Sequence, residues 1–209
     1  MENQSELARQ AHQLGRLEVL MDVVYAVVLW RIFMLLPRPT DGDWNWDSMS
    51  SFLSSNVEIF VILFLAVVIT IIYWIQNNAL FGRLERTDNR HTVISILQIF
   101  FLLLFLYSIR LGTTFSGSVG ARVLESSTAA LVGIASVIGW RYAMKNRRLI
   151  STDVTEQDAR EVLDRILTEP ITALVTIPFA FVGPWIWEVA WFSYPLIASV
   201  LKRRRKAVE

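Results

Sequence analysis

Long apolar segments alternate with short polar segments along the chain. A helix needs about 20 apolar residues to cross a hydrocarbon core about 30 Å thick, and six segments approach that length. Two of them carry no charged residue, and they run from Ile59 to Ile75 and from Val93 to Ile109. The other four cover approximately residues 17–36, 123–144, 171–182 and 185–201. The pattern predicts an all-α membrane protein, with six transmembrane helices in a single domain over residues 1–209.

The four remaining segments differ from these two in composition. The first contains Glu18, Asp22 and Arg31, so it is apolar but not free of charge. The fourth is rich in Ala, Gly and Ser, which are the small residues that let membrane helices approach closely. Gly183-Pro184 separates the fifth segment from the sixth. We therefore expect these two to form a tight helical hairpin or a re-entrant pair.

A polar stretch of residues 145–169 separates the fourth segment from the fifth. Thr155 followed by Asp158 predicts a helix N-cap with an acidic third position. Apolar residues then recur at helical spacing on one face, from Ala159 to Leu167. We expect a cytoplasmic amphipathic linker helix within 145–169, which packs beneath the bundle at the membrane surface. A docking face for a regulatory partner is the alternative.

The distribution of charge predicts the orientation. The net charge is only +1, from 20 Lys and Arg against 19 Asp and Glu, which argues against a globally basic nucleic-acid binder. With a cytoplasmic N-terminus, only Arg38, Arg110 and Arg122 fall in outside segments, Arg31 falls within a span, and the other 16 cations lie inside. Cytoplasmic loops of membrane proteins carry such an excess. We expect both termini to be cytoplasmic in a multi-pass protein of a prokaryotic plasma membrane, with residues 202–209 as a basic tail on anionic lipid.

Aromatic and histidine residues carry simpler expectations. His91 lies in a basic loop and is expected to be solvated. The first outside loop contains Asp41, Asp43 and Trp44, which suits an interfacial anchor. Five tryptophans are expected to form interfacial belts, where amphipathic rings sit at headgroup level. They are Trp74, Trp140, Trp185, Trp187 and Trp191.

Several chemistries are excluded by residue types. The chain has no cysteine, which removes disulfides, thiol nucleophiles and iron–sulfur centres. Only two histidines are present, so no metal or cofactor is expected. An intramembrane hydrolase would need paired Asp residues, a Ser-His pair or a His-Glu metal motif within the spans. None of these motifs occurs in the predicted spans, so we expect no enzymatic activity.

Asp22 is the most informative charged residue in a predicted span. Ionisable residues inside the membrane are costly and usually functional. Arg16, near the cytoplasmic end of the same segment, can pair with a carboxylate of a neighbouring segment. Polar residues flank the second and third spans at a similar depth, and a hydrogen-bonded network with them would lower the cost of burying Asp22. These residues are Gln76, Asn77, Asn78, Ser95 and Gln98.

The order of these residues resembles a known family. Arg16 is followed six positions later by Asp22, and Tyr73-Trp74 is followed by Asn77 and Phe81. This pattern is similar to the first-helix and second-helix signatures of the transmembrane protein 175 family of potassium channels. The chain departs from the family at Leu20 and Met21, where the family has Phe and Ser, and at Asn77, where it has His.

The resemblance implies a homotetramer whose first helices line a central pore that potassium ions cross. The narrowest point in the family is a ring of apolar side chains that begins five residues after the signature Asp. The corresponding residue here is Val27, and Arg31 and Met34 follow on later turns. A constriction of this kind gates by dewetting. The signature network would then stabilise assembly and gating, and its members are Arg16, Asp22, Trp74, Asn77 and Gln98.

Arg31 stands where the family has an apolar residue. If it faced the pore of a tetramer, four guanidinium groups would oppose K⁺ and favour anions or no conduction. Alternatively Arg31 is rotated off the axis, reaches the outer interface, or pairs with Glu58 or Glu188. Cation conduction is the leading hypothesis. An anion-permeable or non-conducting relative and a membrane adaptor are the alternatives.

Overall fold

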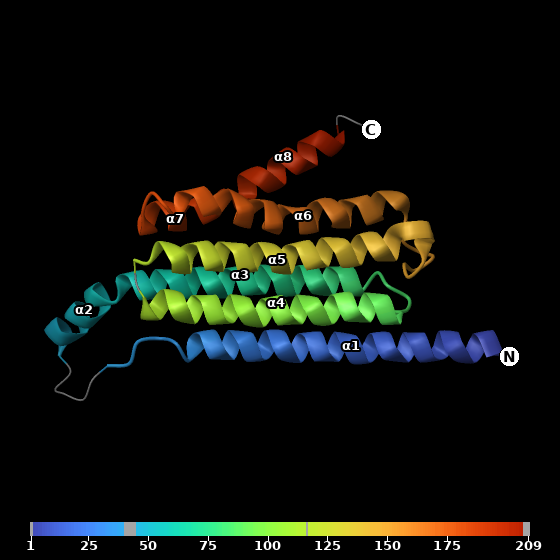
Figure 1. Cartoon of the computed structure of the whole chain (residues 1–209), viewed down its shortest axis with the longest axis horizontal. Helices are drawn as coiled ribbons and strands as arrows, with labels where there is room; N and C mark the ends of the chain where they lie inside the picture. The colour runs from blue at the N-terminus through green and yellow to red at the C-terminus, as the bar shows by residue number, and fades with distance from the viewer. Residues whose placement is uncertain (1, 40–44, 116, 207–209) are drawn as a thin grey trace.

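The computed structural model describes residues 2–39, 45–115 and 117–206, and most of these residues are helical (Figure 1). The acidic residues expected in the first loop, Asp41 and Asp43, lie outside the described residues together with Trp44, as does the end of the basic tail at 207–209. Five long helices lie side by side, and they are α1 (Glu2–Phe33), α3 (Val57–Phe81), α4 (Asn89–Thr114), α5 (Val119–Met144) and α6 (Glu156–Phe179). The shorter elements are α2 (Trp46–Ser55), the 3₁₀ turn η1 (Lys145–Arg147), α7 (Pro184–Trp191) and α8 (Tyr194–Lys206).

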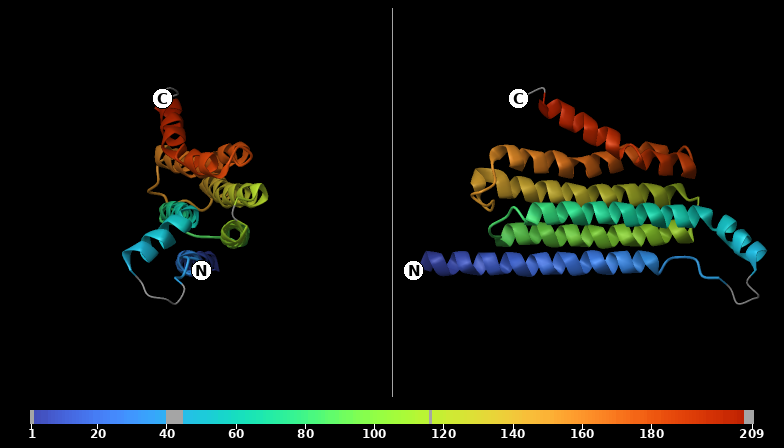
Figure 2. Two further views of the ribbon diagram at one scale, coloured as in Figure 1. Left: turned by 90° about the vertical axis from the view of Figure 1, so that its left-hand side faces the viewer. Right: turned by 180° about the vertical axis from the view of Figure 1, so that it is seen from behind.

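Successive long helices run in opposite directions along the bundle. The described start of α1 and the end of α8 consequently lie toward the same end of the molecule, whereas α2 lies at the other end (Figures 1 and 2). At the end that carries the termini, two loops meet through backbone hydrogen bonds. The Glu85 amide donates to Leu149 O (2.9 Å), and the Ser151 amide donates to Arg83 O (3.0 Å). These bonds tie the α3–α4 loop to the segment after α5.

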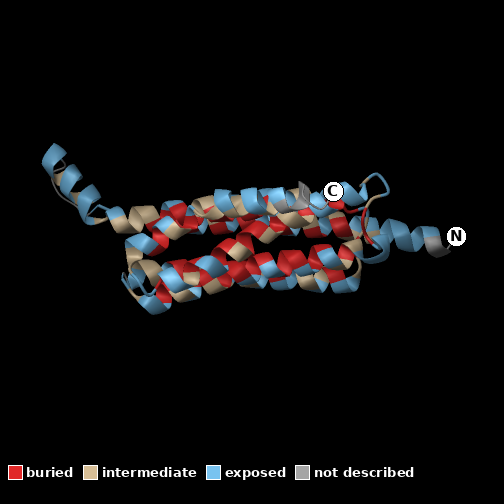
Figure 3. Cartoon of the chain, turned by 90° about the horizontal axis from the view of Figure 1, so that it is seen from above, coloured by how far each residue is buried: buried red, intermediate tan, exposed pale blue. Residues whose placement is uncertain are grey.

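The helix α5 occupies the centre and packs along both α4 and α6. Its small residues make this possible, as the sequence predicts. At Gly133 a Cβ atom would come 2.6 Å from Cδ of Pro170 on α6. Burial is concentrated where the helices face one another, and the outer faces remain exposed (Figure 3).

Among the described residues, three helices are long and apolar enough to cross a membrane by length and composition. These are α3, α4 and α5 with its extension to Arg147. The all-α class and the membrane character are thus confirmed, while the count of six spans stays a prediction. The first predicted span belongs to a longer helix, because α1 begins at Glu2 and its first half is polar.

The predicted linker helix of 145–169 is wrong as a separate element. Residues 148–155 form a loop, and α6 then continues without interruption from Glu156 to Phe179, so it includes most of the predicted fifth span. The Thr155 cap itself is confirmed, because the Asp158 amide donates to Thr155 Oγ1 (3.1 Å) and the Thr155 amide donates back to Asp158 Oδ2 (3.2 Å). The helix passes through Pro170, whose ring fits against Gly133, and membrane helices tolerate proline where neighbours pack against it.

Two further expectations are wrong. His91 is 1% exposed, and its Nδ1 lies 2.9 Å from Thr87 Oγ1. Three of the five tryptophans expected in interfacial belts, Trp140, Trp187 and Trp191, are buried in the bundle. Two of them bond inside it, since Trp140 Nε1 donates to Ala159 O (2.9 Å) and Trp187 Nε1 donates to Ser126 Oγ (2.9 Å).

Candidate functional site: the outer face of α1 and its polar neighbours

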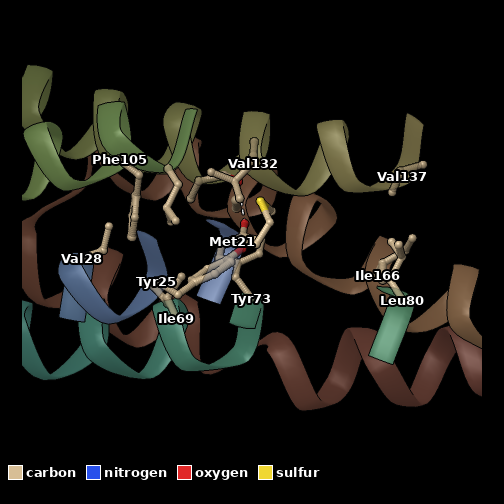
Figure 4. Close-up of a cluster of buried hydrophobic side chains, with 14 of the residues drawn as sticks. Met21, Tyr25, Val28, Ile69, Tyr73, Leu80, Phe105, Val132, Val137 and Ile166 are labelled. Carbon is tan, nitrogen blue, oxygen red and sulfur yellow. Dashed lines mark hydrogen bonds between the residues drawn. The ribbon is translucent and has the colours of Figure 1, made fainter. Parts of the chain in front are cut away.

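One face of α1 is buried against α3 and α4. Its members recur every three or four residues, which is the spacing of one helical face. Met21, Tyr25 and Val28 are among them, and Figure 4 shows them together with Ile69 and Phe105 of the neighbouring helices. The complete face consists of Leu14, Leu17, Met21, Tyr25, Val28 and Ile32.

The face of α1 that points away from the bundle is also apolar, yet it is exposed. Leu20, Val27 and Met34 are 45%, 44% and 42% exposed. Met34 directly follows the end of α1, and its amide still donates to Trp30 O (3.0 Å), so it continues the last helical turn. Since successive helical residues are about 100° apart, the three side chains lie within about 20° of one line. We call this line the outer stripe. Val19 and Val23 extend the exposed apolar surface to one side of it.

Arg31 lies beside the outer stripe and is exposed. Its guanidinium carbon is 5.2 Å from the ring centroid of Trp30, a cation–π geometry. The ion pair with Glu58 or Glu188, one of the alternatives left open by the sequence, is not formed among the described residues. The side chain is therefore held against its own helix.

Asp22 is bound at the edge between α1 and α3. Trp74 Nε1 donates to Asp22 Oδ1 at 2.9 Å. Asn78 completes a triangle: with its amide oriented to satisfy its neighbours, it donates to Asp22 Oδ1 and accepts from Trp74 Nε1, each at 3.2 Å. Asp22 itself remains exposed at this edge.

Asn77 and Gln98 form a different and buried cluster. Gln98 Nε2 donates to Asn77 Oδ1 (3.4 Å) and to the Tyr25 hydroxyl (3.5 Å). The single network expected around Asp22 is thus two networks. The reason is geometric, because consecutive residues such as Asn77 and Asn78 lie about 100° apart around α3 and meet different neighbours.

Arg16 joins neither cluster. It is exposed and forms no ion pair with a described residue. It lines a surface pocket with His12, Gln13 and Thr92, where Gln13 Nε2 donates to Thr92 Oγ1 (3.2 Å). The expected pairing of Arg16 with a carboxylate is therefore absent among the described residues.

Residues 16–105 match the model of a protein family described as endosomal/lysosomal potassium channel TMEM175. Over this region, which is less than half of the chain, the sequence is similar to the TMEM175 family. The matched region contains the outer stripe and both polar clusters, and it covers α3 and much of α1 and α4.

Solved structures of TMEM175 proteins share the fold over almost the whole chain. One is the crystal structure of a lysosomal potassium-selective channel TMEM175 homolog from Chamaesiphon minutus, with 15% identity and a TM-score of 0.73, covering 92% of this chain and 98% of that one. Another is the crystal structure of a variant of the potassium channel MtTMEM175 in complex with a nanobody–MBP fusion protein, with 14% identity and a TM-score of 0.62, covering 92% of this chain and 93% of that one. No curated protein matches the sequence.

The chain also buries charged residues outside the matched region. Glu125, Glu188 and Arg122 surround a small cavity between α5 and α7, and Glu169 is buried on α6. Arg122 donates through Nε (3.2 Å) and Nη2 (3.0 Å) to Ala180 O, just before the Gly183-Pro184 turn. The sequence analysis did not single out Glu125, although it lies inside the predicted fourth span, where the cost of intramembrane charge could have identified it.

Proposed function

We propose that the chain is a subunit of a potassium-permeable ion channel whose pore is lined by α1. Its similarity to the TMEM175 family and its fold, shared with structures of potassium channels, support this function. The observation that carries the proposal is the outer stripe. An apolar line with an exposed face on a peripheral helix fits a surface that copies of the chain complete.

The proposed assembly is a homotetramer with four α1 helices around one axis. In that arrangement Val27 contributes to an apolar ring and Met34 to a second ring two turns further along. Apolar rings oppose ion passage when the pore dries and permit it when the pore widens and hydrates. Val27 is therefore the proposed constriction, with Met34 and Arg31 on the following turns.

The position of Arg31 weakens its opposition to cations in this proposal. It lies about 40° from the Val27 position around α1, and its guanidinium stacks on Trp30 instead of extending along the outer stripe. A charge turned off the axis is weakened by solvent and ions at the pore wall. Four such groups then raise the barrier for K⁺ without closing the pore to it.

The two polar clusters have separate roles in the proposal. The Asp22–Trp74–Asn78 triangle fixes α1 to α3 at an exposed edge, and the Gln98 cluster fixes α1 to α3 and α4 inside the bundle. Both hold the outer stripe at a defined rotation. Arg16, unpaired within the described subunit, is available to a neighbouring copy. The expected result of altering them is weaker assembly before altered selectivity.

Flux from proteoliposomes under a K⁺ gradient tests the function. Wild-type protein should carry K⁺, and Val27→Ser should increase conductance or relax selectivity because a hydroxyl keeps the constriction wet. Val19→Ser is the matched control, since Val19 is an exposed α1 valine (63%) about 80° away from Val27 around the helix. Absence of wild-type flux, or equal effects of both substitutions, contradicts the proposal.

Reversal potentials in KCl gradients test the sign of the permeant ion. The wild type should reverse near the K⁺ equilibrium potential, and Arg31→Ala should raise the conductance without moving the reversal potential to the Cl⁻ side. A wild type that reverses near the Cl⁻ potential would establish an anion channel instead.

A further inference from the structure

A cavity of about 170 Å³ lies between α3, α6 and the α7–α8 junction. Its walls are almost entirely apolar and include Leu65, Val68 and Ile69 on one side and Phe192 and Pro195 on the other. A dry cavity of about 150 Å³ lined by aliphatic and aromatic side chains can hold a molecule the size of benzene. The volume is therefore sufficient for a six-carbon ring.

One carboxylate interrupts this apolar lining. Glu169 lines the cavity and is 5% exposed. One of its oxygens, Oε1, accepts a hydrogen bond from Gln76 Nε2, while the other, Oε2, is buried and has no partner among the described residues. A buried, half-satisfied carboxylate is costly unless a cation or a donor completes it.

No cationic group forms an ion pair with Glu169 among the described residues. Arg165, one turn earlier on α6, is exposed and acts on the carboxylate only through its charge at longer range, and the Tyr194 hydroxyl is the other polar group beside it. A second polar atom in the lining, Nε1 of Trp191, also has no partner among the described residues. Two unpartnered polar atoms in an otherwise apolar wall are typical of a ligand pocket with a few orienting polar groups.

We propose that this cavity binds a small hydrophobic amine, with its ammonium group on Glu169 Oε2 and its hydrocarbon body against Leu65, Ile69 and Phe192. The ammonium supplies both the donor and the countercharge that Glu169 lacks. A hydroxyl or ether oxygen on the same molecule would accept from Trp191 Nε1. The site is separate from the outer stripe, so it does not depend on the proposed conduction.

An open groove of about 460 Å³ provides access to the cavity. Figure 2 shows α8 leaving the bundle beside α6. The groove is lined by residues of both helices, and it shares Ile72 and Tyr194 with the cavity wall. Its lining is largely apolar but also carries charges of both signs, with Arg165 and Lys202 beside acidic residues of α6. An amphiphilic molecule can thus pass from a mouth that carries charged groups into an apolar interior.

Calorimetric titration of the full-length protein in detergent tests the site with two probes of one shape. Cyclohexylmethylamine should bind the wild type, and Glu169→Gln should weaken its binding at least tenfold, because the ion pair is lost while the side-chain volume is kept. Cyclohexylmethanol, which has no positive charge, should bind at least tenfold more weakly than the amine and should not respond to Glu169→Gln.

The matched control is Glu188→Gln, which removes another buried carboxylate (3% exposed) on α7, outside the cavity lining. It should leave the affinity for the amine unchanged. Size-exclusion profiles and melting temperatures establish that each variant is folded. The proposal is overturned if the amine does not bind, if it binds Glu169→Gln as well as wild type, or if the alcohol binds equally well, as expected for a pocket that only holds lipid chains.

Discussion

The contact between α5 and α6 at Gly133 gives a direct test of the packing. A Cβ atom at this position would lie 2.6 Å from Pro170 Cδ and 3.1 Å from both Cβ and Cγ of the same ring. The three atoms belong to one rigid pyrrolidine, so no side-chain rotation can relieve the overlap. Gly133→Ala must therefore move one helix away from the other.

Two opposing contributions set the size of the effect. Alanine favours a helix over glycine by about 1 kcal/mol. Overpacking a well-packed core costs typically about 1–3 kcal/mol, and a contact with three ring atoms belongs in the upper part of that range. We expect a net loss of about 1–2 kcal/mol in the free energy of unfolding. In a chain of this size that corresponds to a fall in melting temperature of roughly 2–8 °C.

Thermal unfolding in detergent, followed by tryptophan fluorescence, measures this loss. Gly139→Ala on the same helix is the matched control. A Cβ atom added at Gly139 would lie 3.5 Å from its nearest neighbour, Ile94 Cγ2, which is an ordinary van der Waals contact. The control should melt at or above the wild-type temperature. If Gly133→Ala also melts at or above that temperature, the helices separate without cost and the close-packing argument fails.

Three further results are expected. Trp74→Phe keeps the ring but removes the donor to Asp22, so melting should reveal a loss of about 1 kcal/mol; no loss would mean that water replaces the bond. Hydrogen bonds from Thr155 hold the pKa of Asp158 below its usual 3.8, so its stabilisation is present above that pH and disappears as the pH falls through the lower folded-state pKa. Asp158→Asn should reduce this acid sensitivity in melting curves, and an unchanged pH profile would exclude the effect. Since the chain has no cysteine, an impermeant maleimide should label Ser50→Cys from outside intact cells and Ser5→Cys only after permeabilisation, and the opposite pattern would reverse the orientation.

Much of the fold was predictable because hydropathy and capping act locally. The uncharged runs became α3 and α4, and the small residues of the fourth segment became the close-packed α5. The Thr155 cap was also correct to the residue. The boundary between the linker and the fifth span was not predicted correctly. The polarity of a segment indicates where the chain meets water, but it does not indicate where a helix ends. The fit of Pro170 against Gly133 is a tertiary contact that no local pattern contains.

The candidate site divides in the same way. The resemblance to the potassium-channel family, counted from Asp22, suggested Val27 and Met34 as pore residues, and both fall on one exposed line. The sequence analysis grouped Asn77 with Asp22 because both were expected at a similar depth in the membrane. In the structure they belong to two clusters, because Asn77 points in a different direction around α3 from Trp74, which binds Asp22. His91 was misjudged because a basic neighbourhood in sequence does not reveal that the side chain turns inward to Thr87.

The hydrogen bonds of Arg122 alter the electrostatics of the end of the bundle opposite the termini. Its guanidinium is buried and bound to the Ala180 carbonyl, so it does not contribute a mobile surface charge there. Arg38 and Arg110 remain as exposed cations toward that end, together with the exposed Asp47. A less positive rim repels cations less, so the local concentration of cations falls less than it would with a third exposed arginine. Because Arg122 is bound to the α6–α7 turn, its positive charge is kept away from the surface. Cations therefore approach the proposed pore more easily than they would if this arginine were exposed.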